Sequence, residues 1–157
     1  MTALLATLAL TTPAEATTYV APLGLESLAE RSDVAIVGEV LNTWTERCGA
    51  GICTVASVLV DETLSGEPRT LVEARWPGGR IGELEMVVAG APRFHEGDRT
   101  LLFLDTDGDV VGMAQGAFAV DGDTVVRDMH NLSFTRAGEA ADTAERFSLS
   151  EVRATFP

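Results

Sequence analysis

The chain has 157 residues, the size of one domain with a modest hydrophobic core. Its 24 acidic residues outnumber its 11 basic residues, which are all arginines, and the formal net charge is −13. Proteins bind nucleic acids mainly by neutralising phosphates, and a surface this acidic repels them. Nucleic acids and anionic membrane surfaces are therefore not expected as partners.

Residues 1–16 are expected to form a secretory signal peptide. The apolar run Ala3–Leu10 is too short to cross a bilayer, which takes roughly 20 residues, and a small-x-small cleavage pattern follows it and ends at Ala16. The mature chain would then start at Thr17 and be secreted or periplasmic, without membrane insertion. Because no basic residue precedes Arg31, an ordinary apolar tail is the alternative interpretation.

Residues 17–135 are predicted to form one β-domain that opens with a short helix over Pro22–Arg31, where Leu25 and Leu28 share a face. The segments that follow alternate between apolar and polar residues, which predicts strands with one face in solvent. The predicted strands are Asp33–Trp44, Thr54–Leu64, Leu71–Trp76, Leu84–Val88, Arg99–Leu104, Val110–Met113, Ala117–Val120 and Thr124–Arg127. Gly38 interrupts the first strand, and a glycine inside a strand often marks a bulge where a sheet curls.

The connections between these strands are short turns rich in glycine, proline and aspartate, too short to hold a crossover helix. The strands should therefore pair antiparallel, with Leu101–Leu104 the most buried because it is apolar on both faces. Closure removes exposed strand edges, so we expect a small antiparallel OB-like β-barrel. Residues 136–157 should form a loose connection and a short C-terminal helix that begins at the capping-box sequence Ser148–Glu151.

Cys48 and Cys53 are the two cysteines of the chain, and glycines between them allow a tight loop. Nearby cysteines usually pair in an oxidising compartment, so a disulfide at a hairpin tip is expected. Free thiols, or a metal or redox site, are the alternatives. A redox motif has two residues between its cysteines, whereas four intervene here, and a zinc site would also require His95 and His130.

Several segments resemble OB-fold domains of exported bacterial proteins. Ser32–Val40 is similar to the opening strand of these domains, and Thr54–Gly66 is similar to their valine-rich second strand with its V-x-x-x-L-K-G ending. The similarity continues through Pro77–Gly79, Gly90–Phe94, Gly97-Asp98, Leu101–Leu104 and Ala114–Phe118. These motifs are turns and buried positions, so the resemblance implies a fold and no particular activity.

More distantly, the layout resembles netrin-like domains and tissue inhibitors of metalloproteinases, which share the OB barrel. Those inhibitors bind the zinc of their target through an N-terminal cysteine. A mature chain that starts at Thr17 has no cysteine before Cys48, so this sequence departs from that inhibitory mechanism.

Three carboxylates, on Asp105, Asp107 and Asp109, are spaced so that they can converge on one hard cation such as calcium. The EF-type calcium loop requires glycine at its sixth position and an acidic residue at its twelfth, and these positions hold Val110 and Gly116. A hairpin turn kept soluble by its acids is the favoured interpretation, and weak calcium binding is the alternative.

Glu83 and Glu85 alternate with apolar residues and are expected on the solvent face of a strand, although a small carboxylate-dependent hydrolase can be imagined. Trp76 is expected in the core. Trp44 near the cysteine loop is either core or an exposed contact for a partner.

No catalytic constellation, metal site or cofactor motif is predicted from the sequence. The leading hypothesis is a non-enzymatic exported module that binds a protein, peptide or glycan. The alternatives are an inhibitor or accessory domain of an extracellular protease, and the small hydrolase.

Overall fold

The computed structural model describes residues 22–129, 132 and 144–156. The predicted signal peptide, residues 1–16, lies outside the described residues, as does His130. The described chain contains the helices α1 (Leu25–Arg31) and α2 (Leu149–Arg153) and a short 3-10 helix, η1 (Met113–Gly116). The predicted capping box is present at the start of α2, where the side chains of Ser148 and Glu151 each accept a hydrogen bond from the backbone of the other.

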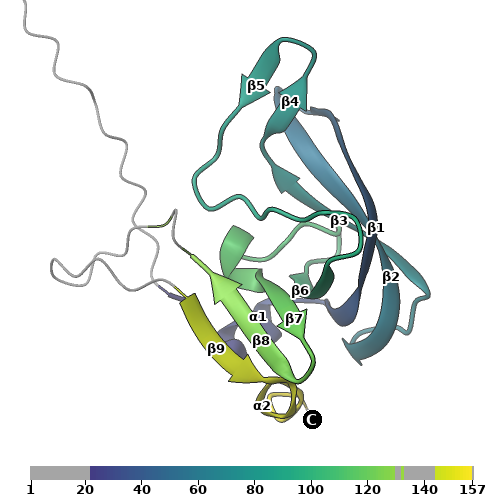
Figure 1. Ribbon diagram of the computed structural model, residues 1–157, viewed down its shortest axis with the longest axis vertical. Helices are drawn as coiled ribbons and strands as arrows, with labels where there is room; N and C mark the ends of the chain where they lie inside the picture. The colour runs from purple at the N-terminus through teal and green to yellow at the C-terminus, as the bar shows by residue number, and fades with distance from the viewer. Residues whose placement is uncertain (1–21, 130–131, 133–143, 157) are drawn as a thin grey trace, which may run out of the picture.

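The described strands form a seven-stranded antiparallel sheet and a separate two-stranded hairpin (Figure 1). The sheet runs in the order β3-β2-β1-β6-β7-β8-β9. Its strands are β1 (Val34–Cys48), β2 (Gly51–Ser65), β3 (Leu71–Pro77), β6 (Arg99–Leu104), β7 (Ala117–Asp121), β8 (Thr124–Asp128) and β9 (Ala144–Ser148). The hairpin consists of β4 (Gly79–Ile81) and β5 (Leu84–Met86). The prediction of a mainly β, antiparallel fold with two short α-helices is confirmed.

Several stretches differ from the predicted elements, among them β4, which was not one of the predicted strands. Val110–Met113 is not a strand, because Gly112 and Met113 take left-handed φ angles of 66° and 61° and turn the chain into η1. Conversely, β9 lies in a stretch that was predicted to be loose. It is a polar strand that pairs with β8 alone among the described strands.

The sheet is not closed into a barrel, which corrects the predicted OB-like barrel. Within the described residues, β3 and β9 are the two ends of the sheet and no ladder joins them. The β3 edge is met by a single parallel bridge between Arg75 and Asp109. There the N–H of Arg75 donates to Gly108 O, and the Arg75 carbonyl accepts from Val110 N, each at 2.9 Å. A turn therefore covers this edge, because the extended stretch ends before a ladder can form.

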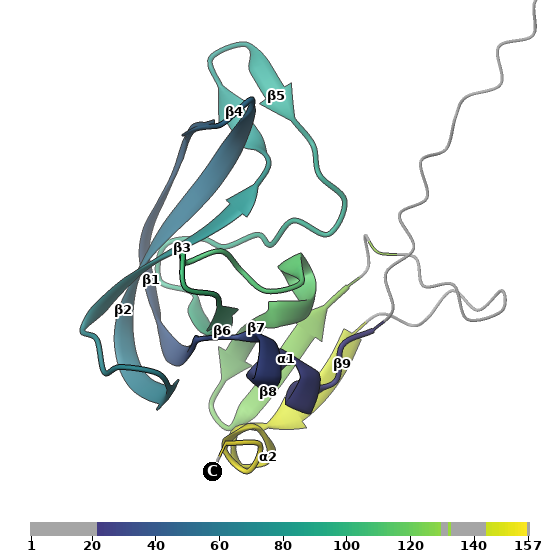
Figure 2. The same cartoon turned by 180° about the vertical axis from the view of Figure 1, so that it is seen from behind.

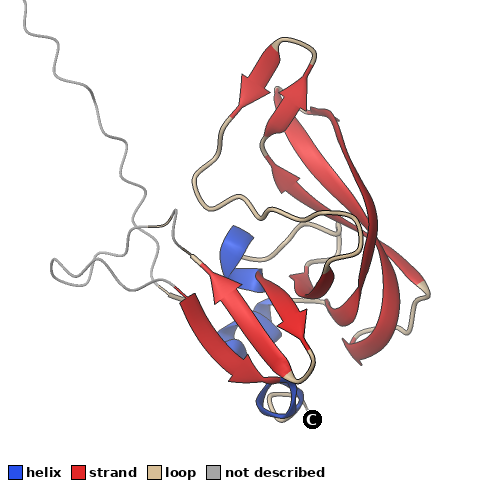
Figure 3. Cartoon of the chain, in the orientation of Figure 1, coloured by secondary structure: helices blue, strands red, loops and turns tan. Residues whose placement is uncertain are grey.

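Two large apolar clusters form most of the core on the two faces of the curled sheet, and a smaller third cluster joins Ala114, Met129 and Leu132. β6 takes part in both large clusters, since Leu101 and Phe103 join one cluster and Leu102 and Leu104 join the other. All five residues from Thr100 to Leu104 are buried, which confirms the prediction for this strand. The first cluster lies under the two α-helices, which gather at one end of the molecule (Figure 3). Seen from behind, α1 lies over β7 and β8 (Figure 2).

Arg127 on β8 is buried under this helical end, with an exposed fraction of 2%. Its guanidinium donates to Leu23 O at 2.7 Å and to Gln115 O at 3.2 Å, and it also pairs with the Glu145 carboxylate. Gln115 in turn accepts a hydrogen bond from Leu23 N at 2.8 Å. One cationic side chain thus joins the segment before α1, the 3-10 helix and β9. Burial of this arginine was not predicted from the sequence.

Candidate functional site

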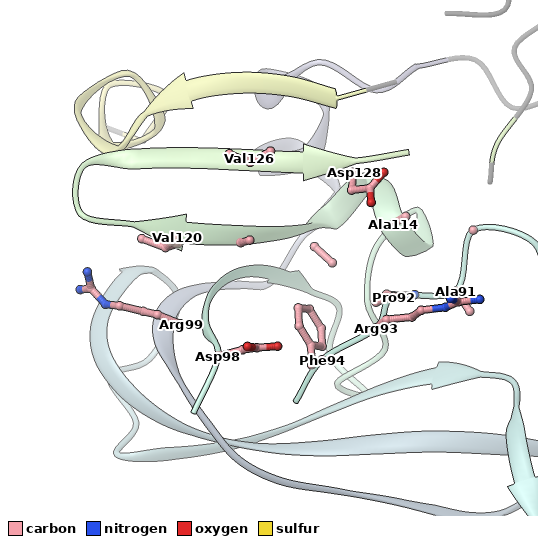
Figure 4. A pocket seen from close by; sticks show the side chains of 13 residues that line it. Ala91, Pro92, Arg93, Phe94, Asp98, Arg99, Ala114, Val120, Val126 and Asp128 are labelled. Atoms are coloured by element: carbon pink, nitrogen blue, oxygen red, sulfur yellow. The ribbon is translucent and has the colours of Figure 1, made fainter. Parts of the chain in front are cut away.

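A pocket of about 300 Å³ opens between the loop 90–99 and the outer face of the β7–β8 pair (Figure 4). We refer to it as the β7–β8 pocket. Its loop wall is formed by Ala91, Pro92 and Phe94, and Ala114 of η1 borders one end. Its strand wall is formed by Ala117, Ala119, Val120, Val126 and Asp128.

The pocket exists because the strand wall carries small side chains. Residues paired directly across an antiparallel ladder share a face, and Ala119 pairs with Thr100 on one side and with Val126 on the other. The bulkier neighbour Phe118 points to the opposite face, where it joins the core beneath the helices. On the loop side, Phe94 packs edge-on against Trp76, with 5.6 Å between the ring centroids.

The loop wall is held in place by hydrogen bonds to itself and to β1. Gly97 N donates to Val40 O at 2.8 Å, and Val40 N donates to Asp98 O at 2.9 Å. The Asp98 carboxylate accepts from His95 N at 2.6 Å. This network forms a turn at Glu96 and Gly97 and fixes the loop to the long first strand.

Two arginines stand at opposite ends of the pocket (Figure 4). Arg99 donates to the Asp61 carboxylate at 3.1 Å and is therefore engaged. Arg93 is exposed and has no hydrogen bond or ion pair within the part of the chain that the structure describes. The pocket thus combines mainly apolar walls with one guanidinium at its rim that is free to pair with a ligand.

A second recess of about 550 Å³ lies beside the β4–β5 hairpin, and we refer to it as the hairpin recess. It is lined by Trp76, by Met86 and Val88, and by the same residues 91–93 that border the β7–β8 pocket. Val87 on its rim is 83% exposed, the most exposed of the large apolar side chains in the described chain.

The predicted disulfide between Cys48 and Cys53 is present, with the Cα atoms 5.7 Å apart. It closes the tip of the β1–β2 hairpin. Next to it, Gly51 lies so close to β5 that an added Cβ would be 3.2 Å from Met86 Sδ. The pairing of both cysteines contradicts the free-thiol and zinc alternatives, and the disulfide is compatible with an extracellular or periplasmic location.

Replacing both cysteines with serine is expected to lower the free energy of unfolding by about 2 kcal/mol, because a short disulfide loop restricts the unfolded chain only modestly. Far-UV circular dichroism should stay β-rich, since Thr45 Oγ1 still donates to Arg80 O at 2.6 Å and supports the tip. Urea unfolding measures the loss. A reductant should lower the free energy of unfolding of the natural chain by the same amount and leave that of the double variant unchanged. An equal decrease in both proteins would contradict a stabilising disulfide between Cys48 and Cys53.

Trp44 lies on the sheet face opposite Trp76. It pairs with Val55, which pairs with Arg75, so these three side chains share one face of the sheet. Trp76, in the neighbouring row, is 3% exposed, which confirms the core prediction. Trp44 is half-buried, and its Nε1 donates to Glu46 Oε2 at 3.4 Å. A partner contact through Trp44 stays a prediction.

The acidic segment after β6 is a turn, as the favoured interpretation predicted. The Asp105 carboxylate accepts from Asp107 N at 3.0 Å and from Asp109 N at 2.9 Å. Burial, reinforced by the nearby Asp105 carboxylate, raises the pKa of Asp109. Within the described residues, no group of three or more His, Cys, Asp or Glu side chains is placed to hold a metal ion.

The two glutamates considered for hydrolysis lie on the β4–β5 hairpin, and both are exposed. Glu83 is in the turn and not in a strand, and Glu85 pairs with Arg80 across the hairpin. Glycosidases place an acid and a base on either side of a bound sugar, usually from different elements. One exposed hairpin does not provide that arrangement for these two side chains.

Comparisons with protein-family models, with curated proteins and with solved structures each found no significant match to this chain. The resemblance to OB-fold domains therefore stays a prediction. Within the described chain, no helix has the length and apolar character that crossing a bilayer requires.

The residues of the two recesses were not identified from the sequence. Gly90–Phe94 enters the sequence analysis only as one of the segments that resemble OB-fold domains, and the alanines at 117 and 119 only as part of a predicted strand. The one available signal was the pair of alanines at alternate positions, since side chains this small leave room on a sheet face that a loop crosses.

Proposed function

We propose that this chain is a non-enzymatic binding module of an exported protein, and that it holds a peptide or protein ligand by accepting an apolar side chain in the β7–β8 pocket. The observation that carries the proposal is a pocket of about 300 Å³ with mainly apolar walls and an arginine at its rim. Ligand sites are typically apolar recesses with a few polar groups that orient the ligand. The disulfide supports an oxidising location.

A peptide suits this pocket better than a glycan does. A sugar ring presents hydroxyls on all sides and needs many hydrogen-bonding partners, whereas most of the lining consists of alanine, proline, valine and phenylalanine. Two of its charged groups already have partners within the protein, because Asp98 accepts from His95 and Arg99 pairs with Asp61. An apolar side chain of a peptide requires none of these bonds.

The test is a substitution that fills the pocket. Ala119 is exposed and lines the strand wall, so Ala119→Trp should fill the space without disturbing the core. Peptides selected on the full natural chain from a random phage-displayed dodecapeptide library serve as probes. Their dissociation constants should rise at least about tenfold in Ala119→Trp, because the burial of one leucine-sized side chain is worth about 1.5 to 3 kcal/mol.

The matched control is Ala154→Trp, which adds the same side chain at an exposed alanine that borders neither recess. It should leave the dissociation constants unchanged. Peptides that bind both variants as tightly as the natural chain would show that the pocket is not the binding site. A library that yields no specific peptide would also count against the proposal.

A further inference from the structure

The β7–β8 pocket and the hairpin recess are neighbours on either side of one short segment. Ala91, Pro92 and Arg93 line both cavities, whose volumes are about 300 and about 550 Å³. A ligand that crosses this segment can therefore place side chains in both. An extended polypeptide is narrow enough to cross the segment, and it has a side chain about every 3.2 to 3.4 Å along the chain that can enter a cavity.

The hairpin recess offers apolar surface of its own. Trp76 is among its lining residues, and Met86, Val87 and Val88 line the hairpin side. Leu84 on the same hairpin is 56% exposed and Val87 is 83% exposed, although large apolar side chains are usually buried. Exposed apolar groups on the rim of a concave surface are typical of interaction sites.

Arg93 supplies the polar contact between the two cavities. It borders both of them, and no hydrogen bond or ion pair engages it within the described part of the chain. A guanidinium presents donors in a planar fork that matches a carboxylate. Arg99, the other arginine at these cavities, is engaged by Asp61. The charge complement of Arg93 itself is therefore an anionic group on the ligand.

We infer that the ligand is an extended peptide segment with two apolar side chains, one for each cavity, and a carboxylate between them that pairs with Arg93. This inference rests on the proposed function and specifies its ligand. It also runs against the charge of the whole chain, because a net charge of −13 favours basic ligands at long range. Tighter binding of a ligand with a carboxylate would therefore point to Arg93 and not to the net charge of the chain.

The probes are fluorescent peptides of glycine and serine that carry two leucines separated by one, two or three residues, one of which is aspartate, asparagine or lysine. Binding is measured by fluorescence anisotropy at 0.15 M salt with the full chain. In at least one spacing, the aspartate peptide should bind about threefold to fivefold more tightly than the asparagine peptide, as expected for one exposed ion pair. The lysine peptide should bind more weakly than either.

Two variants test the two parts of the inference separately. Arg93→Gln should abolish the difference between the aspartate and asparagine peptides while leaving the binding of the asparagine peptide unchanged. Ala89→Trp fills the hairpin recess from an exposed position on its lining. It should weaken the two-leucine peptides about tenfold and leave one-leucine peptides unaffected, because one anchor is lost.

The outcomes separate this inference from the proposed function. If Ala119→Trp weakens binding but Arg93→Gln and Ala89→Trp do not, the ligand uses the β7–β8 pocket alone and the extended site is refuted. A preference for lysine over aspartate would also refute it, because the net charge of the whole chain, and not Arg93, would then determine which peptide binds more tightly. If none of these peptides binds more weakly to Ala119→Trp, the proposed function fails as well.

Discussion

Replacing Arg127 with methionine is expected to lower the free energy of unfolding by about 2 to 4 kcal/mol. The substitution keeps most of the apolar stem but removes the donors to Leu23 O and Gln115 O. A buried carbonyl that loses its partner costs about 1 to 3 kcal/mol. The bond to Gln115 O is buried and the bond to Leu23 O is partly buried, so both losses contribute. The contacts of the guanidinium with the rings of Phe118 and Phe147, at 5.4 and 5.8 Å from their centroids, are lost too. Urea unfolding at pH 7, followed by circular dichroism, measures the change.

Two further substitutions make this result specific. Arg146→Met removes an exposed arginine from β9 and should change stability by less than about 0.5 kcal/mol. Arg127→Lys should recover only part of the loss, since an ammonium group cannot match the fork of a guanidinium. Hydrogen exchange at Leu23 N should speed up in Arg127→Met, because its acceptor Gln115 loses its anchor. Unchanged exchange and unchanged unfolding would show that these contacts do not stabilise the segment before α1.

The elements that depend on local pattern were predictable from the sequence. The period-two alternation located most strands, because a strand with one face in solvent requires it. The run Leu101–Leu104 identified the central buried strand, and Ser148 with Glu151 identified the start of α2. Each of these signals lies within a few neighbouring residues.

The features that depend on distant segments were not predictable. Arg127 lies two residues after Val125 and faces the core as Val125 does. An arginine in a strand suggests a solvent face unless its partners are known. Those partners, Leu23 and Gln115, lie 104 and 12 residues away in the sequence. The predicted closure of the barrel was wrong for a similar reason. It assumed an extended strand at Val110–Met113, and the chain turns at Gly112 instead. The β7–β8 pocket likewise forms only where the loop 90–99 crosses two strands that follow it in the chain.

At Gly38 a prediction from local sequence agrees with a contact between distant segments. The sequence predicts a bulge there, and the structure shows why a side chain is excluded. The β1–β2 register shifts between Val37 and Gly38, which confirms the irregularity. A Cβ at position 38 would lie 2.3 Å from Leu59 O and 2.8 Å from Val58 Cγ1. The first of these atoms belongs to the backbone of the paired strand, so a small rotation of a side chain cannot relieve the contact.

Gly38→Ala is therefore expected to lower the free energy of unfolding by about 3 kcal/mol, at the upper end of the usual cost of overpacking. Gly24→Ala is the matched control. Gly24 has a φ of −70°, and an added Cβ would meet only Glu26 Oε2, at 3.5 Å, an ordinary contact. The control should change stability by less than about 1 kcal/mol and can raise it, because alanine restricts the unfolded chain. If urea unfolding gives equal midpoints for the two variants, the close approach of β1 and β2 does not require glycine. The curl of β1 would then have to come from its other register shifts, on either side of Gly38.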